Sequence, residues 1–165
     1  MKRLTVLLAA ILFAASALAQ GPKPVLTVQG KNLATVTFSA DDLAKLQHVK
    51  VMAPRGHKPE KVEYEGIPLK VILEKAAVLN AAKPLHGKQL LQYVVFTASD
   101  GYRVLFSLAE LEEATGATSG VILADKIAGQ PLTEKEAPLQ LVVPSDKRPE
   151  RFARMISTIT VASAE

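Results

Sequence analysis

The residues best suited to ligand chemistry form a basic cluster near the end of the 165-residue chain. Within eight positions the sequence places Lys147, Arg148, Arg151 and Arg154. An arginine guanidinium presents paired N–H donors in a planar fork, which matches the oxygen pairs of phosphates and carboxylates. Asp146 and Glu150 lie in the same segment and partly neutralise it, so a solvated turn without a ligand is the alternative interpretation.

Aromatic and acidic side chains accompany these arginines. Asp100-Gly101 predicts a tight hairpin turn, because this pair accepts positive φ angles, and Tyr102 and Arg103 follow it. Strand alternation then places Tyr102 and Arg103 on opposite faces. Phe152 lies beside two arginines, where an aromatic ring can stack on a flat ligand. The alternatives are hairpin packing for Tyr102, a surface charge for Arg103 and a core position for Phe152.

Sequence signatures of metal sites and of hydrolytic enzymes are missing. The chain contains no cysteine, and its three histidines, His48, His57 and His86, have no HxH or HExxH spacing. We expect surface or turn positions for these histidines and no bound metal. The sequence also has no Gly-x-Ser-x-Gly elbow, P-loop or dinucleotide-binding glycine motif.

Short strands and helices are predicted in the first half of the chain. Alternating or β-rich runs predict strands over residues 25–28, 34–38, 48–52 and 61–64. Ser39 is expected to cap a short helix, and Glu65-Gly66 to form a turn. Pro68 suits the first position of the next helix, because its missing N–H has no partner there. The apolar face of that helix comprises Leu69, Ile72, Leu73 and Ala76.

The second half has the same character. Strands are predicted over residues 91–98, 102–106, 121–124, 139–143 and 154–161. Ser107 and Glu110 have the spacing of a capping box ahead of a short helix. Residues 115–120 predict a loop and residues 127–132 a turn, and the last strand places Met155 on one face with Ile159 and Val161. The whole order predicts a strand-rich α+β protein with short inserted helices.

Three stretches resemble the molybdopterin-binding domain of the sulfite oxidase superfamily. They are residues 64–69 (YEGIPL), 98–108 (ASDGYRVLFSL) and 138–148 (PLQLVVPSDKR), and the resemblance extends over about residues 25–161. It implies a sulfite-oxidase-like fold of mixed β-sheets around a pterin cofactor. In the enzymes of that family, which are molybdenum oxidoreductases, a cysteine thiolate ligates the metal.

This chain has no cysteine for that role. Residues 51–56 (VMAPRG) correspond to the loop where the enzymes carry it, and neither Met52 nor Ala53 can supply a thiolate. Arg55 lies in the same loop. The resemblance therefore implies the pocket without the protein ligand of the metal.

The resemblance also implies which residues contact a ligand. The turn after the predicted strand at 139–143 faces the cofactor in that family, so Arg148 or Arg151 is expected to pair with its phosphate. Asp100 and Asp146 can each accept two N–H groups from the guanidine-like edge of a pterin. The candidate ligand-binding residues are Arg55, Asp100, Tyr102, Arg103, Asp146, Arg148, Arg151 and Phe152.

The first 19 residues predict export. Lys2-Arg3 precedes an apolar run over residues 4–15, and residues 17–19 (ALA) present small side chains to a signal peptidase. The run is shorter than the ~20 residues of a membrane span, and its basic start is not a twin-arginine signal. We therefore expect cleavage before Gln20, the general secretory route, a periplasmic location and a single domain over residues 20–165.

The mature chain is close to neutral. Residues 20–165 carry 18 basic and 16 acidic side chains, a formal charge of +2, and no tryptophan. Neither a basic surface nor a stacking platform for bases is predicted, which argues against nucleic acid as a partner. Without cysteine, packing alone must hold the fold.

We therefore expect a periplasmic protein that binds a pterin or molybdopterin-type small molecule and is not an enzyme. The resemblance implies a sensor role at the periplasmic face of an inner-membrane signalling protein, as in small exported relatives. Two alternatives stay open. One is a molybdopterin-dependent oxidoreductase or a redox subunit, and the other is a protein-interaction scaffold with a decayed pocket.

Overall fold

The computed structural model describes residues 23–56, 60–112 and 120–164. Its first sheet has five strands in the order β2-β1-β10-β5-β6. They are β1 (Leu26–Gly30), β2 (Leu33–Phe38), β5 (Gln92–Ala98), β6 (Arg103–Ser107) and β10 (Ile156–Ser163). β1 pairs with β10 in parallel, and the other neighbours pair antiparallel. The predicted signal segment, His57 and residues 115–119 of the predicted loop lie outside the described residues.

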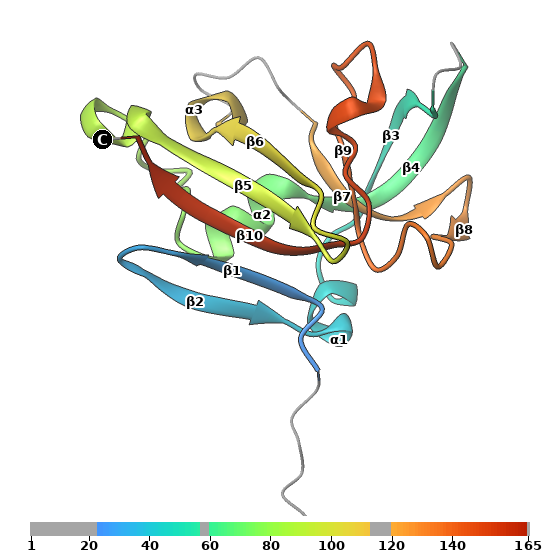
Figure 1. The fold of residues 1–165 in the computed structure, drawn as a ribbon, viewed down its shortest axis with the longest axis horizontal. Helices are drawn as coiled ribbons and strands as arrows, with labels where there is room; N and C mark the ends of the chain where they lie inside the picture. The colour runs from blue at the N-terminus through green and yellow to red at the C-terminus, as the bar shows by residue number, and fades with distance from the viewer. Residues whose placement is uncertain (1–22, 57–59, 113–119, 165) are drawn as a thin grey trace, which may run out of the picture.

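The second sheet also has five strands. They are β3 (Val49–Pro54), β4 (Lys61–Pro68), β7 (Ile122–Ile127), β8 (Gln130–Pro131) and β9 (Gln140–Val142). The strands follow the order β3-β4-β7-β8, β9 also pairs with β7, and these pairs are antiparallel. Figure 1 shows the first sheet on the left and the second on the right.

Short helices connect the strands and confirm the predicted α+β class of mixed sheets with inserted helices. They are α1 (Ala40–Ala44), α2 (Leu69–Lys75), α3 (Leu108–Leu111) and the 3₁₀ helices η1 (Gly87–Leu91) and η2 (Pro149–Arg151). Within the described ranges, none of these helices has the length and apolar character needed to cross a membrane.

One hydrophobic core joins the two sheets. Its fully buried side chains come from both sheets and from α2, and they include Ile72, Phe96, Phe106, Ile122 and Leu141. Phe96 and Phe106 pack edge to face, with ring centroids 5.7 Å apart. This core holds in place the strand ends from which the loops of the candidate site emerge.

Two local predictions are confirmed in atomic detail. Ser39 caps α1 in a capping box, in which the Asp42 N–H donates to Ser39 Oγ and the Ser39 N–H to the Asp42 carboxylate. At the β5–β6 hairpin, Gly101 has a φ of 88° and the Tyr102 N–H donates to Asp100 Oδ1 at 2.9 Å. The hairpin turn therefore has the positive φ that favoured glycine there.

The predicted turn at Glu65-Gly66 is wrong, because both residues continue β4. The pairing of β4 with β7 shifts register at this point. A Cβ atom built on Gly66 would lie 2.2 Å from the carbonyl oxygen of Leu123 on β7. The glycine is there because two backbones approach closely, a role that a single glycine within a strand can also signal.

Helix starts also differ from the predictions. Pro68 ends β4 and is the N-cap of α2, not its first residue. Ser107 makes no side-chain capping bond at the start of α3, and Glu110 instead accepts a hydrogen bond from Arg151 at 2.8 Å. A contact between residues far apart in sequence has replaced the local capping box.

The last strand begins at Ile156, two residues later than predicted, and the residues that share its buried face differ from the prediction. Met155 precedes β10 with a positive φ of 53°, and the pairing with β5 shifts between Ile156 and Thr158. Ile156 and Ile159 are therefore the residues buried in the core. An irregularity in the ladder changed which residues share a face.

Candidate functional site

Backbone hydrogen bonds join three distant parts of the chain beside the second sheet. The Met155 N–H donates to the carbonyl of Glu136 at 3.0 Å, and the Leu141 N–H to that of Ala153 at 2.8 Å. The Ser99 N–H at the hairpin tip donates to the Met155 carbonyl at 2.9 Å. The β5–β6 hairpin, the chain around β9 and the chain after η2 therefore form one frame.

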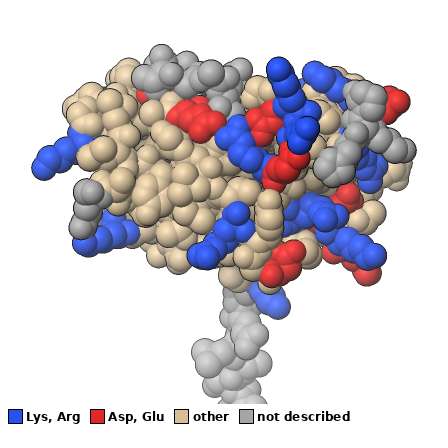
Figure 2. All heavy atoms as spheres, turned by 45° about the horizontal axis from the view of Figure 1, so that its top comes forward, with Lys and Arg blue, Asp and Glu red and all other residues tan. Residues whose placement is uncertain are grey.

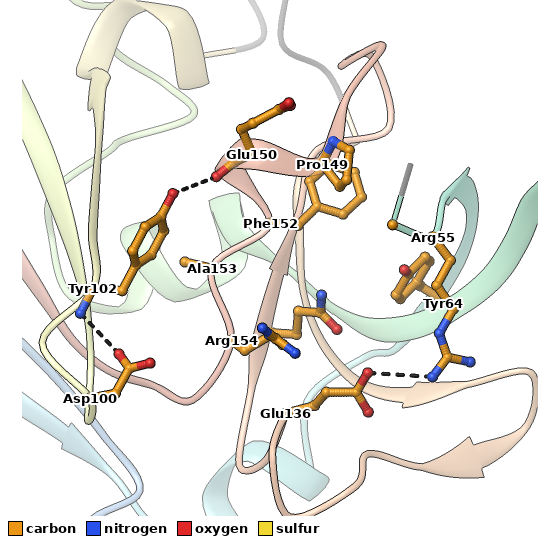
Figure 3. A pocket seen from close by; sticks show the side chains of 12 residues that line it. Arg55, Tyr64, Asp100, Tyr102, Glu136, Pro149, Glu150, Phe152, Ala153 and Arg154 are labelled. Carbon is orange, nitrogen blue, oxygen red and sulfur yellow. Dashed lines mark hydrogen bonds and ion pairs between the residues drawn. The ribbon is translucent and has the colours of Figure 1, made fainter. Parts of the chain in front are cut away.

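This frame borders a cavity of about 500 Å³, which is the size of a small-molecule site. Its lining comes from the end of β3, β4, the hairpin, the chain before and within β9, and the segment around η2 (Figure 3). The lining residues are Arg55, Gly56, Tyr64, Asp100, Tyr102, Glu136, Gln140, Pro149, Glu150, Phe152, Ala153 and Arg154. It mixes aromatic, acidic and basic side chains.

Tyr64 and Phe152 form an aromatic corner of the cavity. Their rings meet edge to face, with centroids 6.3 Å apart and planes at 82°. The buried Tyr64 hydroxyl donates to the carbonyl of Pro54 at 3.3 Å, and burial raises the pKa of Tyr64. The tyrosine is thus a neutral wall of the cavity. Phe152 packs in the core, as the core interpretation predicted, and it also lines the cavity, while its stacking on a ligand stays a prediction.

An ion pair crosses one side of the cavity. Arg55 Nη2 lies 3.4 Å from Oε1 of Glu136. The other oxygen of Glu136 accepts from the Thr133 backbone at 3.2 Å and its hydroxyl at 2.7 Å. Burial alone would raise the pKa of Glu136, but the Thr133 hydrogen bonds and the charges of Arg55 and Arg154 outweigh it and lower that pKa. Both carboxylate oxygens are therefore engaged.

Arg154 is the cation in the cavity whose donors are available. It is exposed, and it makes no hydrogen bond or ion pair with any residue that the structure describes. In Figure 3 its guanidinium lies between the Asp100–Tyr102 side of the cavity and the Arg55–Glu136 pair. An available guanidinium in a cavity of this size can pair with an anionic group of a ligand.

Gln140 is the buried polar residue of the cavity. Only 6% of the residue is exposed, yet it lines the cavity, while its backbone pairs with Ala124 in the sheet. Its Oε1 is buried and has no hydrogen-bond partner among the described residues. A buried amide oxygen without a partner is uncommon and calls for an explanation.

Tyr102 joins the hairpin to η2 at the rim. Its hydroxyl donates to the carbonyl of Glu150 at 2.8 Å, and the ring is about half exposed. Asp100 Oδ1 already accepts the Tyr102 N–H. The aromatic ring therefore presents an open face at the rim, where a ligand ring can contact it.

The structure uses Arg151 and Asp146 to hold η2 in place. Arg151 donates from Nε and Nη2 to the two oxygens of Asp146 at 2.8 and 2.6 Å. Its Nη1 donates to Glu110 at 2.8 Å, and the guanidinium lies 4.3 Å from the Phe106 ring centroid. These hydrogen bonds raise the pKa of Arg151. The guanidinium forms intramolecular contacts on three sides, and neither Arg151 nor Asp146 lines the cavity.

The eight candidate residues thus divide into two groups. Arg55, Asp100, Tyr102 and Phe152 line the cavity, whereas Arg103, Asp146, Arg148 and Arg151 do not. Arg103 is exposed on β6, an edge strand, and Arg148 is exposed at the N-cap of η2. Their ligand roles stay predictions, and the geometry favours the first group.

Sequence reasoning did not select five polar or aromatic residues that line the cavity: Tyr64, Glu136, Gln140, Glu150 and Arg154. Gln140 had a usable signal, since it is the single polar residue in the apolar run at 139–143. A polar side chain in a strand buried on both faces needs a partner, and a ligand can be that partner.

The described histidines lie outside the cavity lining. His48 contacts the Leu46 carbonyl through Nδ1 at 2.9 Å and Asp125 through Nε2 at 3.1 Å. His86 is exposed at the start of η1. In the described part of the chain, no group of three or more His, Cys, Asp or Glu is arranged to hold a metal ion. The expected lack of a metal stays a prediction.

Charges of both signs lie side by side over the right part of the face drawn in Figure 2, and an uncharged area left of its centre has basic side chains at its edge. The cavity lining has the same mixed character, with two arginines beside Asp100, Glu136 and Glu150. The cavity therefore favours a ligand that carries both donor and acceptor groups.

The fold is that of a known class. The chain is similar to the crystal structure of the sulfane dehydrogenase SoxCD from Paracoccus pantotrophus, with a TM-score of 0.63 and 19% sequence identity. The similarity covers 84% of this chain and 38% of that one. It establishes a sulfite-oxidase-like molybdopterin fold, as the sequence resemblance implied. A search of curated proteins gave no match.

The family follows from the sequence comparison. Residues 53–165 match the family described as oxidoreductase molybdopterin binding domain, and the chain belongs to this family. A molybdopterin-type ligand is thus supported at the level of the family.

The residues present fit the organic part of that cofactor only. The cavity has room for a bicyclic ring, an available guanidinium at Arg154 and an unpartnered amide at Gln140. No thiolate is available, because the chain contains no cysteine. Met52 is exposed, Ala53 is fully buried, and neither lines the cavity.

Proposed function

We propose that this protein is an exported, non-catalytic binding protein for a pterin or molybdopterin-type small molecule. The cavity is the observation that carries the proposal. It has a volume of about 500 Å³, and its lining includes polar groups with hydrogen-bonding capacity available to a ligand. The chain contains no cysteine and therefore no thiol to ligate a metal. Family membership supports the choice of a pterin over other flat heterocycles.

In this proposal each group of residues has a role. Arg154 pairs with an anionic substituent, and Tyr102 offers a ring face at the rim. Tyr64 and Phe152 exclude water from the inner wall, while the Arg55–Glu136 pair closes one side. A bound molybdopterin would bring its own dithiolene sulfurs as metal ligands.

The predicted export signal supports the proposed location, and the resemblance to small exported members of the family supports the proposed partner. The mature protein is released in the periplasm and reports ligand binding to the periplasmic face of an inner-membrane signalling protein. Crosslinking in cells, followed by mass spectrometry, tests this part: capture of an inner-membrane signalling protein from ligand-replete but not ligand-depleted cells is expected. Equal capture in both conditions would contradict ligand-dependent reporting.

The binding proposal is tested on protein purified natively from the periplasm. Mass spectrometry of released small molecules is expected to detect a pterin, and titration with fluorescent pterins is expected to saturate. No released pterin together with no saturable binding would favour the scaffold alternative.

A molybdopterin-dependent oxidoreductase or redox subunit is the second candidate, and the family match favours it. Elemental analysis of the same preparation separates the two candidates. Stoichiometric molybdenum would replace the binding-protein proposal by the oxidoreductase one.

A further inference from the structure

The buried side-chain amide of Gln140 lines the cavity without a hydrogen-bond partner for its oxygen among the described residues, and no contact within the protein explains its position. It lies on β9 between the buried Leu139 and Leu141 in sequence, and it lines the cavity together with aromatic and charged side chains. The Gln140 Oε1 accepts no hydrogen bond from any described residue. Burial without a partner weakens the folded state, so the side chain is better accounted for by a contact made in the bound state.

The other polar groups of the inner cavity already have partners. Glu136 is engaged at both carboxylate oxygens by Arg55 and Thr133. Tyr64 donates its hydroxyl proton to the Pro54 carbonyl. At the inner wall, Gln140 is therefore the group with unused hydrogen-bonding capacity.

A carboxamide recognises a particular pattern. It presents one acceptor beside two donors on a single plane, and it pairs with an edge that offers an N–H next to a C=O. A pterin has such an edge at its N3–H and C4 carbonyl. Its guanidine-like edge offers two donors side by side and instead matches a carboxylate.

We propose that Gln140 is a specificity-determining residue that pairs with the N3–H and C4 carbonyl, the lactam edge, of a pterin. The inference rests on the proposed function, because it assumes that the cavity binds a pterin. It places the lactam edge at the inner wall beside β9 and leaves the ring substituents toward Arg154 and the rim.

The test combines ligand and protein changes in one cycle. Pterin and 3-methylpterin, which lacks the N3–H, are titrated by fluorescence against wild type and Gln140→Leu at pH 6.5. Methylation is expected to weaken binding to wild type about tenfold, as loss of a hydrogen-bonded edge does. In Gln140→Leu the two ligands are expected to bind alike, with the affinity for pterin reduced about tenfold.

A second ligand and a control variant make the test more specific. Lumazine, which keeps the lactam edge but has oxygen in place of the 2-amino group, is expected to bind wild type within about threefold of pterin. Gln130→Leu on β8 is the matched control, because Gln130 is exposed outside the cavity lining. It should leave both affinities unchanged.

The ligand-free variant gives an independent readout. Because Gln140 is buried without a partner, Gln140→Leu is expected to melt at the same temperature as wild type or above it. A clear fall in melting temperature would show that Gln140 is needed for the fold, which would overturn the inference.

The results distinguish a failure of this inference from a failure of the proposed function. Equal loss on N3 methylation in wild type and Gln140→Leu would place the lactam edge elsewhere and overturn the inference alone. Loss of binding with lumazine as large as with 3-methylpterin would indicate the guanidine-like edge and also overturn it. No saturable binding of pterin to wild type would overturn the proposed function itself.

Discussion

At the scale of single residues, the partners of each arginine decide which one a ligand can use. Arg151 forms intramolecular contacts with Asp146, Glu110 and the Phe106 ring, whereas Arg154 lines the cavity with its donors available. An arginine whose donors are occupied by protein carboxylates stabilises the fold, and its donors are not available to a ligand. The basic cluster therefore contains residues of both kinds.

Arg154→Gln tests this difference. Pterin-6-carboxylate is expected to bind the variant about tenfold more weakly than wild type, because a charge-assisted hydrogen bond is lost. Neutral pterin should be affected less. Both affinities are measured by fluorescence titration.

Arg148→Gln is the control for that experiment, since Arg148 is exposed outside the cavity lining. It is expected to leave both affinities unchanged. A loss on changing Arg148 but not Arg154 would instead support the contact that the sequence resemblance implied for Arg148.

The carboxylate of Glu136 predicts an acid-sensitive contribution to stability. Its pKa is lowered from the usual 4.5, so the folded state favours the charged form. That contribution is complete above the unfolded pKa and is lost as the pH falls from about 4.5 through the folded value. Glu136→Gln removes it.

Urea unfolding between pH 3 and 7 measures the effect. Wild type should exceed Glu136→Gln by about 1–2 kcal/mol above pH ~5, and the difference should shrink below pH ~4.5. A difference that does not vary with pH would mean that the carboxyl has the same pKa in both states.

The candidate residues show how much of the site could be predicted from the sequence. Arg55, Asp100, Tyr102 and Phe152 were selected because they stand in or beside recognisable motifs. The intramolecular role of Arg151 could not be predicted in full, because Arg151 pairs not only with the nearby Asp146 but also with Glu110, which is 41 positions away. Local sequence carries no record of such a contact.

At the scale of elements, periodicity and turn chemistry predicted where strands, short helices and the β5–β6 hairpin lie. The errors fall where two segments distant in sequence meet. Gly66 indicated a turn but serves a close strand contact, and Ile156 replaced Met155 in the core because the β10–β5 ladder shifts. Both features depend on a neighbouring strand.

Gly66→Ala is expected to be strongly destabilising. The added Cβ would collide with the backbone of Leu123, so β4 and β7 must separate, at a cost of about 2 kcal/mol or more. Chemical denaturation measures the change.

Gly129→Ala provides the comparison. Gly129 has a φ of 74° but nothing within 4 Å of an added Cβ, so only backbone strain of about 1 kcal/mol is expected. If Gly129→Ala cost as much as Gly66→Ala, close strand approach would not be the reason for glycine at position 66.

At the scale of the whole molecule, the proposed role depends on export. Expression of the full chain in a secreting bacterium is expected to give a soluble periplasmic protein whose intact mass begins at Gln20. Ala19→Arg should block cleavage, because a signal peptidase requires a small side chain there, whereas Leu18→Gln should still be processed. Recovery of the wild-type chain with Met1 retained in membranes would contradict the proposal.

The central place of β10 in the first sheet has a consequence for the order of events in the cell. β10 lies between β1 and β5, so the N-terminal ribbon and the β5–β6 hairpin are joined in one sheet only after β10 has been synthesised. Pairing between strands far apart in the sequence is slow, because the entropy of closing the long loop between them is lost before the strand contacts form. The first sheet cannot be completed before β10 is made, so under the proposed export by the general secretory route we expect this part of the nascent chain to stay open for a translocation channel.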